Sequence, residues 1–127
     1  MAQRVPLGVA PLALAAVALT AALVAFAATG PSKGDAAVGT KIYDAKCTPC
    51  HKSDGTGGIK LSGNPTPNWK DAKHVFDPKF NDDVLRDCLT NGKPKSGMPA
   101  WGKTGQLKPD DIENLIAYIH QFFPKKK

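Results

Sequence analysis

The segment Cys47-Thr48-Pro49-Cys50-His51 constrains this chain more than any other feature of its sequence. Two thiols lie three positions apart, and an imidazole directly follows the second thiol. Such a pattern admits four kinds of site: a redox-active dithiol, a zinc site, a small disulfide loop, or a site at which a porphyrin is attached covalently. The sequence around the motif decides among them.

The first three interpretations fit that surrounding sequence poorly. A thioredoxin-like dithiol begins a helix after a strand, whereas here a helical pattern precedes the pair. Zinc needs four ligands, and no second pair of ligands accompanies these crowded residues. A disulfide between Cys47 and Cys50 would close a very small loop and stabilise little.

C-x-x-C-H is, in contrast, the attachment pattern of c-type haem. Two thiols at this spacing reach the two vinyl groups on one side of a porphyrin. The next residue, His51, then lies beneath the ring, where an imidazole nitrogen can bind the iron. We therefore expect one haem c, bound covalently through Cys47 and Cys50.

The distribution of apolar residues explains why such a cofactor would be useful. Apolar residues make up 42% of the 127, which is 53 residues, and 22 of these fall in residues 1–28. The following 99 residues keep only 31, which is lean for a domain that must bury its own core. The chain also has 12 Gly and 11 Pro, which favour long loops. This size and composition exclude a large enzyme, a solenoid and a multi-pass membrane protein.

Residues 1–28 have the layout of an export segment. Arg4 precedes an uncharged, Ala- and Leu-rich run over residues 7–28, and Ala25-Phe26-Ala27 offers small residues at the positions that a signal peptidase reads. The run is also long enough for a membrane-spanning helix. We therefore expect residues 1–28 to be a signal peptide or an N-terminal membrane anchor, and the rest to lie in the periplasm. Residues 29–38 form a short linker or mature N-terminus, and the domain covers residues 35–127.

Helical periodicity and capping residues predict an all-α domain with long loops. We expect helices over residues 35–45, 81–91 and 109–123, and one helical turn over 71–75. Their apolar stripes comprise Val38, Ile42 and Tyr43 in the first helix, Val84, Leu85, Cys88 and Leu89 in the second, and Ile112, Leu115, Ile116, Ile119 and Phe123 in the last. We expect residues 52–79 to be ordered loop.

The second iron ligand must come from another part of the chain. Met98 lies in a short rigid loop, Ser96-Gly97-Met98-Pro99-Ala100-Trp101, and we expect its thioether to bind the iron. His74, on a loop, is an alternative ligand. His120 lies off the apolar stripe of the last helix and is expected in solvent, and Met1 belongs to the export segment.

With these motifs in place, residues 34–124 resemble a class I monohaem cytochrome c of the small exported bacterial type. The resemblance rests on Gly39, Tyr43, C-x-x-C-H, Pro65-Thr66-Pro67-Asn68-Trp69, the helix and turn over 84–92, Met98-Pro99-Ala100-Trp101, and Leu115 with Tyr118. It implies the cytochrome c fold, in which three to four helices and long loops surround one covalent haem. The first and last helices should cross near a right angle at Gly39, with Tyr43 near Leu115 or Tyr118.

The resemblance also implies contacts around the haem. His51 should donate its second ring N–H to a loop carbonyl, that of Pro65 or Pro67. Trp69 and Trp101 should line the haem, unless they serve packing alone. Cys88 departs from the family pattern, and it is either a buried thiol or an exposed one that links two chains.

Iron held by both His51 and Met98 has no open position, which favours one-electron transfer over catalysis. We expect an electron carrier; the alternatives are a haem-bearing subunit of a membrane redox complex and, less favoured, a peroxidase-like enzyme with a displaceable Met98.

Beyond residue 28 the chain has 16 basic and 11 acidic residues, a net charge of +5. Lysines flanking the haem could dock redox partners with acidic patches (Lys46, Lys52, Lys93, Lys95 and Lys103). The lysines are too dispersed to indicate nucleic-acid binding. We expect contact with a membrane only if the N-terminal segment is not cleaved.

Overall fold

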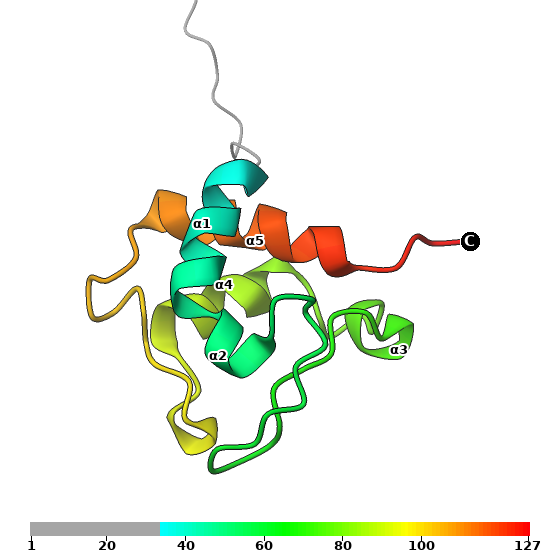
Figure 1. The fold of residues 1–127 in the computed structure, drawn as a ribbon, viewed down its shortest axis with the longest axis horizontal. Coiled ribbons are helices and arrows are strands. Elements are labelled where there is room, and N and C mark those ends of the chain that lie inside the picture. Colours follow the sequence, from blue (N-terminus) through cyan, green and yellow to red (C-terminus); the bar gives the residue numbers. More distant parts are fainter. Residues whose placement is uncertain (1–33) are drawn as a thin grey trace, which may run out of the picture.

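The computed structural model describes residues 34–127, and in this part of the chain the backbone forms helices and loops but no strand (Figure 1). The elements are α1 (Ala36–Lys46), α2 (Thr48–His51), α3 (Ala72–Val75), α4 (Asp82–Asn91), the 3-10 turn η1 (Pro94–Ser96), α5 (Pro109–Ile119) and the 3-10 turn η2 (His120–Phe122). The predicted all-α class is confirmed. The predicted export segment lies outside the described residues, and within residues 34–127 none of the helices has the length and apolarity to span a membrane.

Helix α1 crosses α5 at very close range, and this crossing organises the fold (Figure 1). A β-carbon at Gly39 would lie 2.1 Å from the carbonyl oxygen of Asn114, so only glycine allows the two backbones to approach this closely. Beside this contact, the ring of Tyr43 packs edge-on against that of Tyr118, with centroids 5.1 Å apart. Tyr43 and Leu115 are the largest fully buried side chains. The implied roles of Gly39 and Tyr43 are therefore confirmed.

The buried face of α1 differs from the predicted apolar stripe. Val38 is 41% exposed, and the buried residues of α1 are Gly39 and Tyr43. The reason is the crossing itself, because the helix turns its residue without a side chain towards α5. Asp35 caps α1 as predicted by accepting from the N–H groups of Ala37 and Val38.

The last helix is shorter than its periodicity predicts. Helix α5 ends at Ile119, and the chain tightens into η2 before Phe123, which is only partly buried. The tightened turn still serves the core, because the ring of Phe122 packs against Tyr43 with centroids 5.5 Å apart. The stripe from Ile112 to Ile119 is buried as predicted.

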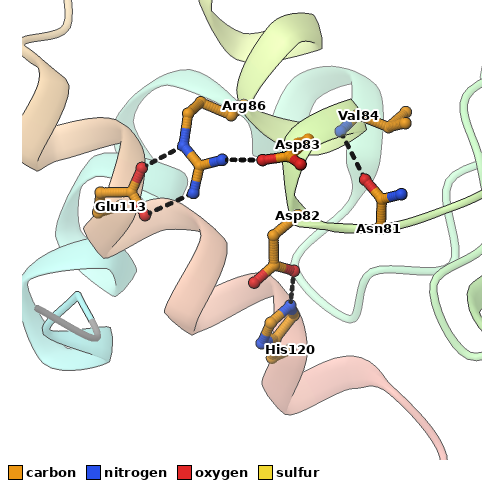
Figure 2. Close-up of polar contacts among 7 residues, drawn as sticks. All are labelled: Asn81, Asp82, Asp83, Val84, Arg86, Glu113 and His120. Carbon is orange, nitrogen blue, oxygen red and sulfur yellow. Dashed lines mark hydrogen bonds and ion pairs between the residues drawn. The ribbon is translucent and has the colours of Figure 1, made fainter. Parts of the chain in front are cut away.

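Side-chain contacts tie helix α4 to α5 at one end and to η2 at the other (Figure 2). Arg86 binds Glu113 through two hydrogen bonds, Nε to Oε1 at 2.5 Å and Nη2 to Oε2 at 3.1 Å, and it also contacts Asp83. This guanidinium holds the pKa of the Glu113 carboxyl below its usual range. At the other end, Nε2 of His120 lies 2.7 Å from Asp82, at the exposed surface where the sequence places it.

Candidate haem-binding site

A cavity of about 390 Å³ lies between the helices and the loops. Its volume is within the range of small-molecule and cofactor pockets. The four predicted site residues, Cys47, Cys50, His51 and Met98, all line it. The apolar part of the wall comes from α4, the end of α5 and the loops, and it includes Leu61, Phe80, Val84, Leu85, Leu89 and Ile119.

The C-x-x-C-H motif adopts one helical turn immediately after α1. The N–H of His51 donates to the carbonyl of Cys47 at 2.9 Å, and the N–H of Lys52 donates to that of Thr48 at 2.9 Å. In a helical turn, residues three and four apart share one face. Cys47, Cys50 and His51 are therefore presented together to the cavity.

The electrostatics of the motif suit metal ligation by His51 and do not suit dithiol redox chemistry. Burial raises the pKa of the Cys47 thiol to about 12, so this thiol is protonated and weakly nucleophilic at neutral pH. Burial also lowers the pKa of the His51 imidazole to about 4. The imidazole is neutral at pH 7, which is the state that binds a metal.

The hydrogen bond implied for the second nitrogen of His51 is not formed. Nδ1 of His51 is buried without a partner, and the ring stacks on Trp69 with centroids 4.7 Å apart and planes 6° apart. The carbonyl of Pro67, one of the two implied acceptors, packs against Gly57 instead. A β-carbon built on Gly57 would lie only 2.1 Å from the Pro67 oxygen. In the described residues the imidazole of His51 thus contacts an aromatic ring and no loop carbonyl.

Thr66 ties the loop after the motif back to the motif itself. Its hydroxyl donates to the carbonyl of Cys50 at 2.7 Å and accepts from the N–H of Ile59 at 3.0 Å. The residues 52–79 are an ordered loop with one short helix, as predicted. Sequence reasoning missed the role of Thr66, and the available signal was a lone hydroxyl between two prolines.

Met98 is held by a tight turn between α4 and α5. Lys93 and Met98 exchange two backbone hydrogen bonds, of 3.0 and 3.1 Å. Gly92 ends α4 with φ 70°, and a β-carbon there would lie 2.6 Å from the carbonyl oxygen of Met98. The turn therefore fixes the backbone of Met98 at the cavity wall.

Four further residues singled out in the sequence also line the cavity: His74, Trp69, Trp101 and Cys88. Trp69 is 4% exposed, whereas Trp101 is partly buried and carries Lys46 Nζ 5.2 Å from its ring centroid. Cys88 is half-buried on the cavity side of α4, which agrees with an interior thiol rather than an exposed one. Nε2 of His74 is buried without a hydrogen-bond partner.

These residues fit a covalently attached haem. The two thiols and the neutral imidazole share one helical face, the apolar wall suits a porphyrin, and a thioether reaches the same cavity from a separate turn. Soft sulfur and imidazole donors are also the ligands that haem iron takes in c-type proteins.

Comparison with known proteins gives the same result. Residues 34–119 match the family described as cytochrome C oxidase, cbb3-type, subunit III. The chain is 31% identical to cytochrome c6 of Gloeothece citriformis, over 84% of this chain and 89% of that protein. It is 34% identical to the cbb3-type cytochrome c oxidase subunit FixP of Bradyrhizobium sp. over 68% of this chain, and it spans only 27% of FixP. The solved KustC0563 c-type cytochrome has the same fold, with a TM-score of 0.52 at 24% identity over 68% of this chain and 98% of that one.

Fold, site and relatives together define a c-type cytochrome, and the chain belongs to the class I monohaem cytochrome c family. Its cofactor is one haem c, attached through Cys47 and Cys50. As a member of this family it is an electron-transfer protein, and its partners are other redox proteins.

Proposed function

We propose that this protein carries single electrons on a haem iron that His51 and Met98 would hold. The observation that supports this proposal best is that both side chains line one cavity although they belong to separate elements, α2 and the turn after η1. When bound, the haem supplies an iron that alternates between the ferrous and ferric states.

The chain's own residues then set the behaviour of that iron. His51 and Met98 would both hold the iron, which would keep small oxidants away from it and favour electron transfer without bond formation. A thioether ligand favours the ferrous state, so Met98 raises the reduction potential above that of a bis-imidazole site. The apolar wall around the cavity excludes water and acts in the same direction, because it disfavours the extra charge of ferric iron.

Replacement of Met98 tests this ligand assignment. In the haem-loaded ferric protein, Met98→Ala should lower the reduction potential and let cyanide bind the iron rapidly, because one axial position opens. Leu61→Ala is the matched control, since Leu61 lines the same cavity but has no ligating atom. An unchanged potential and an iron still closed to cyanide in Met98→Ala would contradict the assignment, and an iron opened instead by His74→Ala would identify His74 as the ligand.

A second candidate function is that of a haem-bearing subunit in a membrane redox complex. The matching family and FixP favour it, because both names refer to cbb3-type cytochrome c oxidase. The two candidates differ in the fate of residues 1–28, which act as a cleaved periplasmic export signal in the free carrier and as a membrane anchor in the subunit. Sequencing the N-terminus of the mature protein distinguishes them: a start near residue 28 supports the free carrier.

We also propose that a lysine rim docks acidic patches of redox partners. Lys46 and Lys93 line the cavity, and Lys52, Lys95 and Lys103 are exposed. The rate of electron transfer to an acidic partner should fall as ionic strength rises, since the Debye length shortens from about 30 Å at 0.01 M to about 8 Å at 0.15 M. Lys93→Gln should weaken this salt dependence. Lys125→Gln in the C-terminal segment removes the same charge away from the cavity, and an equal effect from both variants would contradict a localised docking rim.

A further inference from the structure

Tyr43 carries a hydroxyl group into the centre of the core. Its side chain has no exposed surface, and the hydroxyl donates to the carbonyl of Lys52 at 2.7 Å. The carbonyl oxygen of His51 lies 3.4 Å from the same hydroxyl. A phenylalanine would fill the same space between α1 and α5, so packing alone does not require this oxygen atom.

The residue that receives this hydrogen bond has an unusual backbone. Lys52 has φ 59° and ψ 155°, and within residues 34–127 it is the only non-glycine residue with positive φ. Positive φ with ψ near 155° is a region that side chains with a β-carbon rarely occupy, and such backbone persists only where the surroundings hold it. The Tyr43 hydroxyl is a buried contact that holds the Lys52 carbonyl in this orientation.

The turn at Lys52 controls what surrounds the imidazole of His51. Because of this turn, the loop returns and the N–H of Gly57 donates to the carbonyl of His51 at 3.2 Å. The backbone N–H of Trp69 donates to the carbonyl of Gly55 at 3.0 Å, which brings the Trp69 ring into its stack on His51. Rotation of Lys52 to negative φ would therefore move both the backbone of His51 and the ring that orients its side chain.

We infer that the Tyr43 hydroxyl holds the strained Lys52 peptide in place and thereby orients the His51 imidazole towards the iron. Tyr43 is then a positioning residue, which links the α1–α5 interface to the axial ligand through a single hydrogen bond. The inference rests on the proposed ligation of iron by His51. Neither the packing of the Tyr43 ring nor the covalent attachment of haem would orient the imidazole in this way.

The test compares variants of the haem-loaded ferric protein by paramagnetic proton NMR and by reduction potential. In the wild type, hyperfine-shifted ring protons of His51 must be present; their absence would refute ligation by His51, and hence the proposed function, before any variant is compared. Tyr43→Phe should shift these resonances and change the potential, and it should favour unfolding about tenfold through the lost hydrogen bond. Tyr118→Phe, which removes a hydroxyl from the adjacent ring and leaves the Lys52 hydrogen bond intact, should change neither resonances nor potential.

Rescue at Lys52 separates positioning from packing. In the Tyr43→Phe protein, Lys52→Gly should restore the wild-type resonances and potential, because glycine keeps positive φ without strain. Lys52→Ala removes the same charge but retains a β-carbon, and it should not restore them. The inference is overturned if Tyr43→Phe is less stable with unchanged resonances, or if glycine fails to rescue. If Tyr43→Phe cannot be isolated with haem, Tyr43→Phe/Lys52→Gly decides alone: wild-type resonances support the inference, and altered or absent ones overturn it.

Discussion

Single polar side chains connect the haem motif to the loops that enclose the cavity. Thr66 is half-buried, and its hydroxyl serves two backbone groups, the carbonyl of Cys50 and the N–H of Ile59. Loss of such a hydroxyl leaves both groups without a partner, and an unsatisfied buried group destabilises more than an average hydrogen bond stabilises. The motif itself was predictable from residue types and spacing. The partner of its Cys50 carbonyl was not, because Thr66 is 16 residues away and only the folded loop brings it close.

Replacement of Thr66 by valine should therefore lower the free energy of unfolding of the haem-loaded protein by about 1–3 kcal/mol. The measurement is the urea midpoint at constant m-value. Thr56→Val is the control, because its hydroxyl donates to Asp54 on the exposed part of the same loop. If both variants lost the same free energy of unfolding, the hydrogen bond to Cys50 would contribute no more than an exposed one.

At the scale of whole elements, periodicity and capping residues predicted the helices well, whereas the orientation of their faces depended on packing. The bounds of α1 and α4 agree with the expected 35–45 and 81–91 to within one residue. The apolar stripe of α1 was wrong at Val38, because the backbone contact of Gly39 with Asn114 outweighed the burial of one valine. Periodicity counts apolar side chains, and it therefore gives no weight to a glycine that allows two backbones to touch.

The bridge between α4 and α5 makes a pH-dependent contribution to stability. Arg86 lowers the pKa of Glu113, so the ion pair stabilises the fold above the ordinary carboxyl pKa of about 4.3. That stabilisation is lost as the pH falls through the lowered pKa of the folded protein. Glu113→Gln should therefore destabilise by about 1 kcal/mol at pH 7, since the pair is only partly buried.

Urea unfolding from pH 7 down to pH 3 measures this contribution, and the stability difference between the wild type and Glu113→Gln should shrink towards the acidic end. Asp83→Asn is the matched control, because Asp83 binds the same arginine but its side chain is 91% exposed. Its effect at pH 7 should be smaller, owing to solvent screening. A Glu113→Gln loss that persists undiminished at pH 3 would contradict an ionic origin.

For the molecule as a whole, the cavity is large relative to the core that surrounds it. The side chains that line this open cavity of about 390 Å³ are mostly apolar, and they face solvent unless the haem covers them. Domains of this size are stable by only about 5–15 kcal/mol. The lean apolar content of residues 29–127 therefore matches a fold whose core includes the haem.

A chain without haem should accordingly lose most of its helical structure. Cys47→Ala/Cys50→Ala, which cannot form the thioether bonds, should show a far-UV circular dichroism spectrum with little helix and no cooperative thermal transition. Cys88→Ala removes the third cysteine, which lies on the cavity wall but outside the motif, and it should keep haem and helix. A folded, cooperative double variant without haem would show that the polypeptide core suffices.

The sequence by itself determined the local features of this protein: the C-x-x-C-H motif, its haem, the helices and the turn that carries Met98. These depend on residue type and short spacing, which are visible along the chain. Only the tertiary structure decided what lies around the imidazole: the stack of Trp69 in place of a loop carbonyl, the clamp of Thr66 and the hydrogen bond from Tyr43 to Lys52. Those contacts join segments that lie apart in the sequence, and only folding of the loop against the motif and of α1 against the core brings them together.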